Sequence, residues 1–161
     1  MQARMKHPAL VIPEAMSTLQ ALSGLAEKAG LSRGIVELVH LRCSQINGCG
    51  VCVDMHWRFA NEAGEPLERL FTVAAWRDAS YFTAAERAAL ALAEAMTRLS
   101  DRSDPVPDDI WNAAAQHFNE RELAGLVLAI ATINVWNRLN VATRQIAGEW
   151  VKQYVEAGAR A

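Results

Sequence analysis

Residues 37–56 read E-L-V-H-L-R-C-S-Q-I-N-G-C-G-V-C-V-D-M-H and contain all three cysteines of the chain. Apolar residues recur at helical spacing up to Asn47, and the dipeptide Asn47-Gly48 is a helix breaker. A second helical segment begins near Cys49. This stretch therefore predicts two helices that fold back beside each other across the Asn47-Gly48 turn.

The second of these helices would carry Cys49, Cys52 and His56 along one face, because residues three and four apart are neighbours on a helix. Cys49 would lie at the helix N-terminus, where unpaired N–H groups and the helix dipole favour a thiolate. His56 would lie one turn beyond Cys52, close enough to take its proton directly or through a water. The spacing predicts a redox-active dithiol whose sulfur atoms are near enough to form a disulfide.

The first helix would bring Glu37 beside the dithiol helix. A carboxylate there could orient His56, hold a proton, or both. Periodicity alone leaves open whether Glu37 faces the cysteines. The spacing makes Cys52, Cys49 and His56 the candidate catalytic residues, and by itself it leaves Glu37 either a solvated surface carboxylate or a fourth member of the site. Cys43 is expected in the core, because it lies six residues before Cys49, which is poor helical spacing for pairing.

Two other interpretations of the same residues stay open. The cysteines could be two small buried residues whose spacing is accidental. Alternatively, Cys49, Cys52 and His56 could be three ligands of a zinc site. Structural zinc sites usually draw on two separated ligand pairs, and the chain has no second C-x-x-C and no H-x-x-x-H. We therefore assign no metal ligand and no cofactor from the sequence.

Outside this stretch the chain also has helical periodicity, and we find no convincing strand pattern. Ala and Leu, which favour helices, are abundant, and Gly and Pro are sparse within the periodic segments. We expect an all-α fold of about seven to eight helices in a single domain over residues 1–161, with an extended N-terminal arm over residues 1–12. The expected helices cover residues 13–29, 32–46, 49–63, 66–76, 83–99, 108–118, 119–139 and 141–155.

Composition and charge favour a globular protein without a nucleic-acid or membrane partner. The chain has 161 residues, of which 52% are hydrophobic and 21% charged, as in a globular protein with a sizeable core. Its net charge of −2 and scattered basic residues argue against a nucleic-acid partner. The longest apolar stretch, residues 123–135, is shorter than the roughly 18 residues of a membrane span. No signal-peptide pattern follows the basic N-terminus, so we expect a cytoplasmic protein without a membrane partner.

The segment 134–138 reads N-V-W-N-R and places two amides and a guanidinium on an otherwise apolar helix. We expect these groups to make helix–helix hydrogen bonds or a subunit contact, with lining of the active site as the alternative. The apolar helix faces exceed what a small monomer buries comfortably, which favours a homo-oligomer.

The stretch 37–56 resembles the core of the alkylhydroperoxidase AhpD, within the carboxymuconolactone decarboxylase-like superfamily. The shared pattern is a Glu twelve residues before the first Cys, followed by S-x-x-N-x-C-x-x-C-x-x-x-H. This chain matches the pattern at Glu37, Ser44, Asn47, Cys49, Cys52 and His56. The segments Y-F-T-x-x-E-R-A-A-L at 81–90 and I-N-V-W-N-R at 133–138 look like the single-domain AhpD-like branch.

This resemblance implies an all-helical bundle that assembles into dimers, trimers or hexamers. It also implies an antioxidant enzyme that reduces alkyl hydroperoxides. By this resemblance Cys52 would attack the peroxide to form a sulfenic acid, which Cys49 would resolve to a disulfide. Glu37 and His56 would relay the proton that activates Cys52. A dithiol reductant, such as a lipoyl domain or a thioredoxin-like protein, would recycle the enzyme.

Two features complicate this assignment. The helix dipole favours Cys49 as the thiol of lower pKa, whereas the family assigns the attack to Cys52; we follow the family because His56 is adjacent to Cys52. AhpD proper carries a second histidine just before the second cysteine, where this chain has Val51.

Two alternative functions stay open. One is a redox adaptor or sensor that exchanges disulfides with a partner, which Val51 favours, and the other is a structural zinc or non-catalytic oligomeric protein. The decarboxylase branch generally lacks the C-x-x-C pair, so lactone decarboxylation is not expected.

Overall fold

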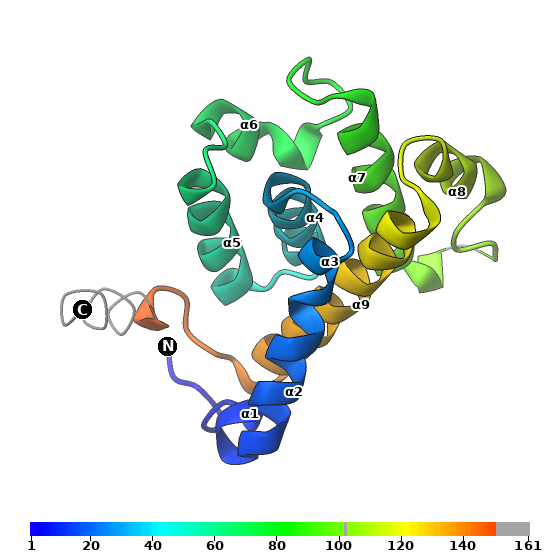
Figure 1. Ribbon diagram of the computed structural model, residues 1–161. Coiled ribbons are helices and arrows are strands. Elements are labelled where there is room, and N and C mark those ends of the chain that lie inside the picture. The colour runs from blue at the N-terminus through cyan, green and yellow to red at the C-terminus, as the bar shows by residue number, and fades with distance from the viewer. Residues whose placement is uncertain (102, 151–161) are drawn as a thin grey trace.

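The computed structural model describes residues 1–101 and 103–150, and these residues form helices with no β-strand among them (Figure 1). The all-α prediction is confirmed. The helices are α1 (Pro8–Val11), α2 (Pro13–Ser23), α3 (Leu25–Lys28), α4 (Arg33–Ile46), α5 (Gly50–Glu62), α6 (Leu67–Thr72), the 3-10 helix η1 (Val73–Ala75), α7 (Ala84–Thr97), the 3-10 helix η2 (Leu99–Asp101), α8 (Asp108–Ala115) and α9 (Glu120–Thr143).

Local capping sets the start of α4, α7 and α9. The Ser32 side chain caps α4 by accepting a backbone N–H of its first turn. Thr83 with Glu86, and Asn119 with Glu122, form reciprocal capping boxes at the starts of α7 and α9. All three caps follow from short-range sequence patterns.

The N-terminal part departs from its prediction in two places. The helix expected over residues 13–29 is divided at Gly24 into α2 and α3. The arm over residues 1–12 is not extended throughout, because His7 accepts a backbone N–H and Pro8 begins the short helix α1. The backbone N–H of Arg4 donates to the carbonyl of Thr143 at 2.9 Å, so the arm lies against the end of α9.

The end of α9 is also different from its prediction. The helix continues through Thr143, and the left-handed backbone of Arg144 (φ 53°) ends it. The prediction of a separate helix that begins at Val141 is therefore wrong. Residues 151–155 of that predicted helix lie outside the described residues. A polar residue such as Asn140 is common at the end of a helix. Here Asn140 is buried within the helix, and its amide donates to Sγ of Cys52 and to the carbonyl of Trp136. Within the described part of the chain, no helix has the length and apolarity needed to cross a membrane.

Helix α4 lies at the centre of the bundle and packs against α5, α7 and α9 (Figure 1). It is buried on almost every side, so its polar residues are enclosed together with its apolar ones. Glu37, His40 and Ser44 are all buried. Buried polar groups are normally hydrogen-bonded, which makes the partners of these three side chains informative.

Gly125 allows α9 to approach α3 closely. A Cβ at this position would lie 2.7 Å from the Cβ of Ala29 and 3.4 Å from the carbonyl oxygen of Ala26. We expect Gly125→Ala to lower the free energy of unfolding by about 1 kcal/mol. The clash with rigid neighbours costs about 1–3 kcal/mol, and the roughly 1 kcal/mol that alanine gains in a helix offsets part of that cost. Urea unfolding monitored by circular dichroism measures the difference.

Gly24→Ala is the matched control for this prediction. Gly24 has φ −75°, and a Cβ there would meet only ordinary contacts at 3.7 and 3.8 Å. We expect this variant to be neutral or slightly more stable, because alanine restricts the unfolded chain. Equal stability of the two variants would show that α3 and α9 are not closely packed at Gly125.

Candidate active site

Cys49 and Cys52 are joined by a disulfide at the N-terminus of α5. Cys49 is the N-cap residue of this helix, and its Sγ accepts the backbone N–H of Cys52 at 3.3 Å. Unpaired N–H groups and the helix dipole stabilise negative charge at such a position. The structure thus brings the two sulfur atoms together, as the C-x-x-C spacing predicts.

Both cysteines are sheltered from solvent, with 1% of Cys49 and 2% of Cys52 exposed. The segment that follows α9 lies beside this end of α5. A Cβ at Gly50 would be 3.7 Å from the Cβ of Ala147, and Nε1 of Trp150 donates to Oδ2 of Asp54 at 3.0 Å. A large molecule therefore has no direct contact with the sulfur atoms in this arrangement.

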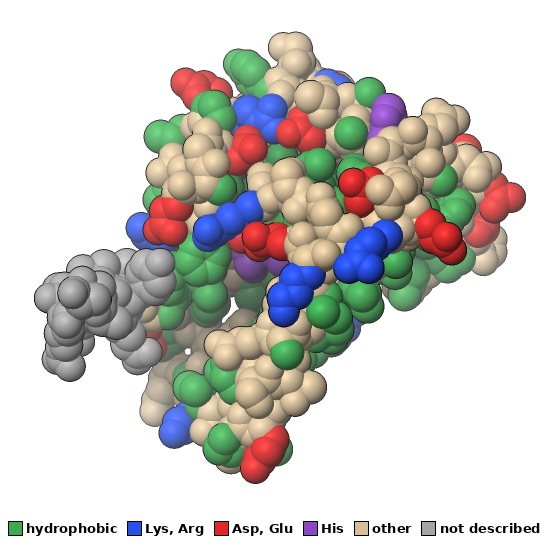
Figure 2. Space-filling view, in the orientation of Figure 1, with side chains coloured by type: hydrophobic (Ala, Val, Ile, Leu, Met, Phe, Trp, Pro, Cys, Tyr) green, Lys and Arg blue, Asp and Glu red, His purple; other side chains and the backbone are tan. Residues whose placement is uncertain are grey.

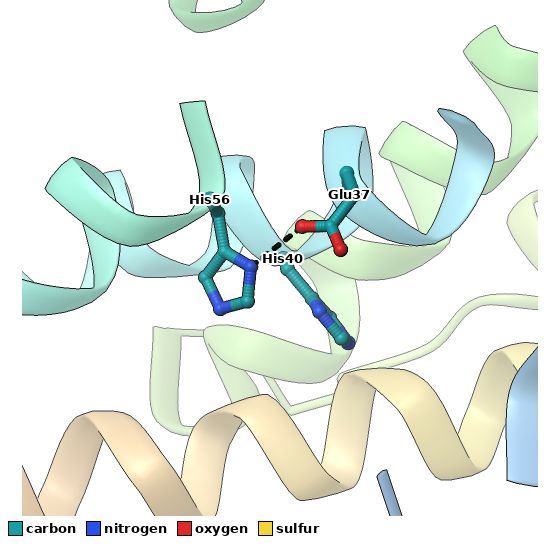
Figure 3. Close-up of side chains that lie close together, drawn as sticks. All are labelled: Glu37, His40 and His56. Atoms are coloured by element: carbon teal, nitrogen blue, oxygen red, sulfur yellow. Dashed lines mark hydrogen bonds and ion pairs between the residues drawn. The ribbon is translucent and has the colours of Figure 1, made fainter. Parts of the chain in front are cut away.

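Glu37 on α4 and His56 on α5 face each other (Figure 3). Oε2 of Glu37 lies 2.7 Å from Nδ1 of His56, and both side chains are largely buried. The Asn47-Gly48 turn folds α5 back along α4, which makes this contact between residues nineteen positions apart. Glu37 therefore faces the histidine of the dithiol helix.

Burial shifts the pKa of both partners. It raises the pKa of the Glu37 carboxyl, an effect that the neighbouring His40 and Arg33 partly offset. Burial also lowers the pKa of His56 to about 4, so the ring is neutral at pH 7. With Glu37 ionised, we assign the ring proton to Nδ1, which donates to the carboxylate. Nε2 then carries a free lone pair and can act as a base.

His40 on α4 is a third titratable group at this place. Its ring centroid lies 4.7 Å from that of His56 in an edge-on arrangement. Burial, and to a lesser extent the neighbouring His56, lower the pKa of His40 to about 3. Within the described residues neither of its ring nitrogens makes a hydrogen bond, although the carbonyl of Ala129 lies close enough to attract the protonated ring. Glu37, His40 and His56 each offer a ligand atom, and these three atoms lie within 4.8 Å of one another.

Asparagines of α9 hold the turn between α4 and α5. Nδ2 of Asn47 donates to Oδ1 of Asn134 at 2.9 Å and to Oδ1 of Asn137 at 2.8 Å. Nδ2 of Asn137 donates in turn to Oγ of Ser44 at 3.0 Å. The prediction of helix–helix hydrogen bonds for the segment 134–138 is confirmed. Ser44 and Asn47, two members of the motif, thus anchor the dithiol turn to α9.

Asn140 was missed by the sequence interpretation. Its Nδ2 lies 3.4 Å from Sγ of Cys52 and donates to the carbonyl of Trp136 at 3.1 Å. The available signal was its spacing: Asn140 follows Asn137 by three residues, which places both amides on one face of a helix. An amide N–H beside Sγ is a donor that would stabilise a thiolate on Cys52.

Cys43 is a core residue, as predicted. It is fully buried, and Oγ1 of Thr97 donates to its Sγ at 3.2 Å. Burial raises the pKa of this thiol to about 12, so it stays protonated and unreactive at neutral pH. The zinc ligand set of Cys49, Cys52 and His56 is not available in this state, because the disulfide engages both sulfur atoms.

Sequence comparison identifies relatives over most of the chain. The model of the carboxymuconolactone decarboxylase family matches residues 13–95. The uncharacterized protein YdfG of Bacillus subtilis (strain 168) is 33% identical over 132 residues, which cover 82% of this chain and 88% of YdfG. The uncharacterized protein YnjA of Escherichia coli (strain K12) is 31% identical over 116 residues, which cover 72% of this chain and 62% of YnjA.

Solved structures share the fold. ATU0492 of Agrobacterium tumefaciens, a protein of unknown function described as a candidate antioxidant defence protein AhpD, superposes with a TM-score of 0.83 at 32% identity, over 91% of this chain and 98% of its own. The debrominase Bmp8 superposes with a TM-score of 0.75 at 17% identity, over 85% of this chain and 73% of Bmp8, which is a likeness of fold alone. By its family match, its relatives and its fold, the chain belongs to the carboxymuconolactone decarboxylase family and is AhpD-like.

Proposed function

We propose that this protein is a thiol-dependent peroxidase that reduces hydroperoxides through a Cys49–Cys52 dithiol cycle. The observation that carries the proposal is a bonded cysteine pair at the start of α5, on the same helix as a histidine that contacts a buried carboxylate. A thiol, a base and a group that orients the base are the parts that activate a nucleophile at neutral pH. The AhpD description of the Agrobacterium relative supports the same chemistry.

In the proposed cycle the Cys52 thiol gives its proton to His56, and the thiolate attacks an oxygen of the hydroperoxide. The O–O bond breaks, the alcohol leaves with a proton, and Cys52 becomes a sulfenic acid. Sγ of Cys49 then attacks Sγ of Cys52, the S–O bond breaks and water leaves. An external dithiol returns two electrons and two protons to the disulfide.

The environment of Cys52 supports its role as the attacking thiol. Cys52 lies one turn before His56, and the amide of Asn140 is 3.4 Å from its Sγ. Cys49 receives a backbone N–H at 3.3 Å, which also favours its thiolate but supplies no base. We therefore retain Cys52 as nucleophile and Cys49 as resolving thiol, with Glu37 orienting the base.

Burial of the disulfide bears on the alternative of a redox adaptor. Because Cys49 and Cys52 are 1% and 2% exposed, a small peroxide reaches them more easily than the surface of a folded partner does. The reductant meets the same restriction. We propose a slender dithiol, such as a lipoyl arm, rather than a direct thioredoxin-like contact.

We also propose that the chain forms a homo-oligomer. Several large apolar side chains are more than a third exposed, and three of them lie on α9: Leu128, Val135 and Val141. Exposed apolar side chains of this size are often covered in an assembly. Light scattering after size-exclusion chromatography measures the subunit number.

Thiol titration tests the peroxidase proposal. The reduced, denatured chain should titrate three thiols, since it has three cysteines. After reaction with one equivalent of cumene hydroperoxide, only the Cys43 thiol should remain, and mass mapping should find a Cys49–Cys52 bond. The Cys43→Ala variant is the control and should lose both of its thiols at the wild-type rate. Three thiols left after peroxide, together with fast disulfide exchange with a protein, would favour the redox adaptor.

A further inference from the structure

We propose that Glu37, His40 and His56 form a binding site for one divalent first-row transition-metal ion, for which Zn²⁺ is the probe. The site lies between α4 and α5, and none of its ligands is a cysteine (Figure 3). The inference does not depend on the thiol chemistry proposed above. It concerns a donor set that the oxidised protein presents while its sulfur atoms are bonded to each other.

The donor set has the composition and spacing of known metal sites. Glu37 and His40 are three residues apart on α4, and a Glu-x-x-His pair on one helix of a bundle is an arrangement that ligates metal in helical-bundle proteins. His56 adds a second imidazole from the neighbouring helix. Two histidines and one carboxylate hold zinc in catalytic sites and iron(II) in non-haem sites, with positions left open for other ligands.

The state of His40 is an independent sign of a ligand. Only 7% of this residue is exposed, and within the described part of the chain neither ring nitrogen has a hydrogen-bond partner. A buried polar group without a partner costs about 1–3 kcal/mol. An apolar side chain would fill the same volume without that cost. A bond from one ring nitrogen to a metal ion would give the imidazole the partner that the protein does not supply.

The dimensions of the cluster suit a small cation. The three ligand atoms lie within 4.8 Å of one another, and Nδ1 of His56 is 2.7 Å from Oε2 of Glu37. Ligands about 2.1 Å from a metal ion are about 3.0–3.4 Å apart. The hydrogen bond between Glu37 and His56 would be replaced by bonds from each residue to the ion. If His56 binds through Nδ1, the proton on that nitrogen moves to Nε2 or is released.

The site has a route to solvent. The side chain of His56 is 13% exposed, more than that of Glu37 at 9%. In the space-filling view, histidine atoms are visible beside a hollow between the N-terminal helices and α5 (Figure 2). The exposed part of the His56 side chain gives an ion access to the cluster without unfolding of the bundle.

Isothermal titration calorimetry of the oxidised full-length chain with ZnCl₂ tests the inference. We expect one saturable site per chain. His40→Asn should raise the dissociation constant for Zn²⁺ by about a hundredfold or more. Loss of a residue that only hydrogen-bonds a metal ligand already lowers metal affinity by about 10–100-fold, and His40 is itself a proposed ligand. His117→Asn is the control for replacement of a histidine outside the cluster, and it should bind as wild type does. Thermal unfolding of the metal-free variants checks that both are folded.

The Cys49→Ser/Cys52→Ser double variant separates this site from a cysteine zinc site. It should bind Zn²⁺ as tightly as the oxidised wild type. Loss of binding in this variant would assign the ion to the cysteines and overturn the inference. Absence of saturable binding to the oxidised chain, or wild-type affinity in His40→Asn, would also overturn it. No peroxide enters these titrations, so their failure is distinguishable from failure of the proposed peroxidase.

Discussion

Cys52→Ser is expected to lower the second-order rate constant of peroxide consumption by about a thousandfold or more. A serine hydroxyl at neutral pH is a far weaker nucleophile than a thiolate, and removing the nucleophile of an activated group generally costs at least this much. The rate is measured as loss of cumene hydroperoxide in the presence of excess dithiol reductant. The fold should be intact, because serine is similar to cysteine in size and Asn140 can still donate to it.

Cys49→Ser is the matched comparison, and it tests which thiol attacks. This variant should still react once with peroxide and form a sulfenic acid on Cys52, which dimedone labelling and mass spectrometry detect. Without the resolving thiol, Cys49→Ser cannot form the disulfide that the external dithiol reduces. Steady-state peroxide consumption with a dithiol specific for that disulfide should therefore be lost. A sulfenic acid on Cys49 in the Cys52→Ser variant, formed at the wild-type rate, would reverse the two roles. The helix-dipole argument for Cys49 would then prevail.

His56→Gln is expected to lower the rate of Cys52 oxidation by about 10²–10⁴-fold at pH 7, the usual contribution of a general base. The amide side chain cannot accept the thiol proton. Stopped-flow measurement of the first oxidation isolates this step from recycling. The loss should shrink as the pH rises, because hydroxide then supplies the thiolate. A loss that is the same at every pH would indicate a structural role for His56.

Glu37→Gln should also lower the rate of Cys52 oxidation, but by less than His56→Gln does. The amide oxygen of glutamine can still accept the Nδ1–H of His56, but its neutral side chain no longer stabilises the imidazolium that forms when His56 takes the proton. In the His56→Gln background, Glu37→Gln should cost little more, because the two residues act as one unit. Full additivity of the two losses would contradict the relay. His117→Asn, a histidine replacement outside the site, again serves as the control.

Local sequence explains most of the helices and half of the site. Ser32, Thr83 and Asn119 cap their helices through side chains within three residues, and such short-range contacts can be predicted without knowledge of the fold. The C-x-x-C spacing at a helix start brings Cys49 and Cys52 together for the same reason. A single polar residue is a weak sign of a helix end. The predicted helix stopped at residue 139, just before Asn140, whereas α9 continues to Thr143.

The sequence by itself determined an all-helical chain, a dithiol at the start of one helix and a histidine one turn later, because helical periodicity is a property of neighbouring residues. Only the tertiary structure decided that Glu37 faces His56, that Asn140 reaches Sγ of Cys52 and that His40 is enclosed without a hydrogen-bond partner. The two contacts join residues that are 19 and 88 positions apart in the chain. They depend on α4 being surrounded by α5, α7 and α9, which is a consequence of packing and not of local spacing.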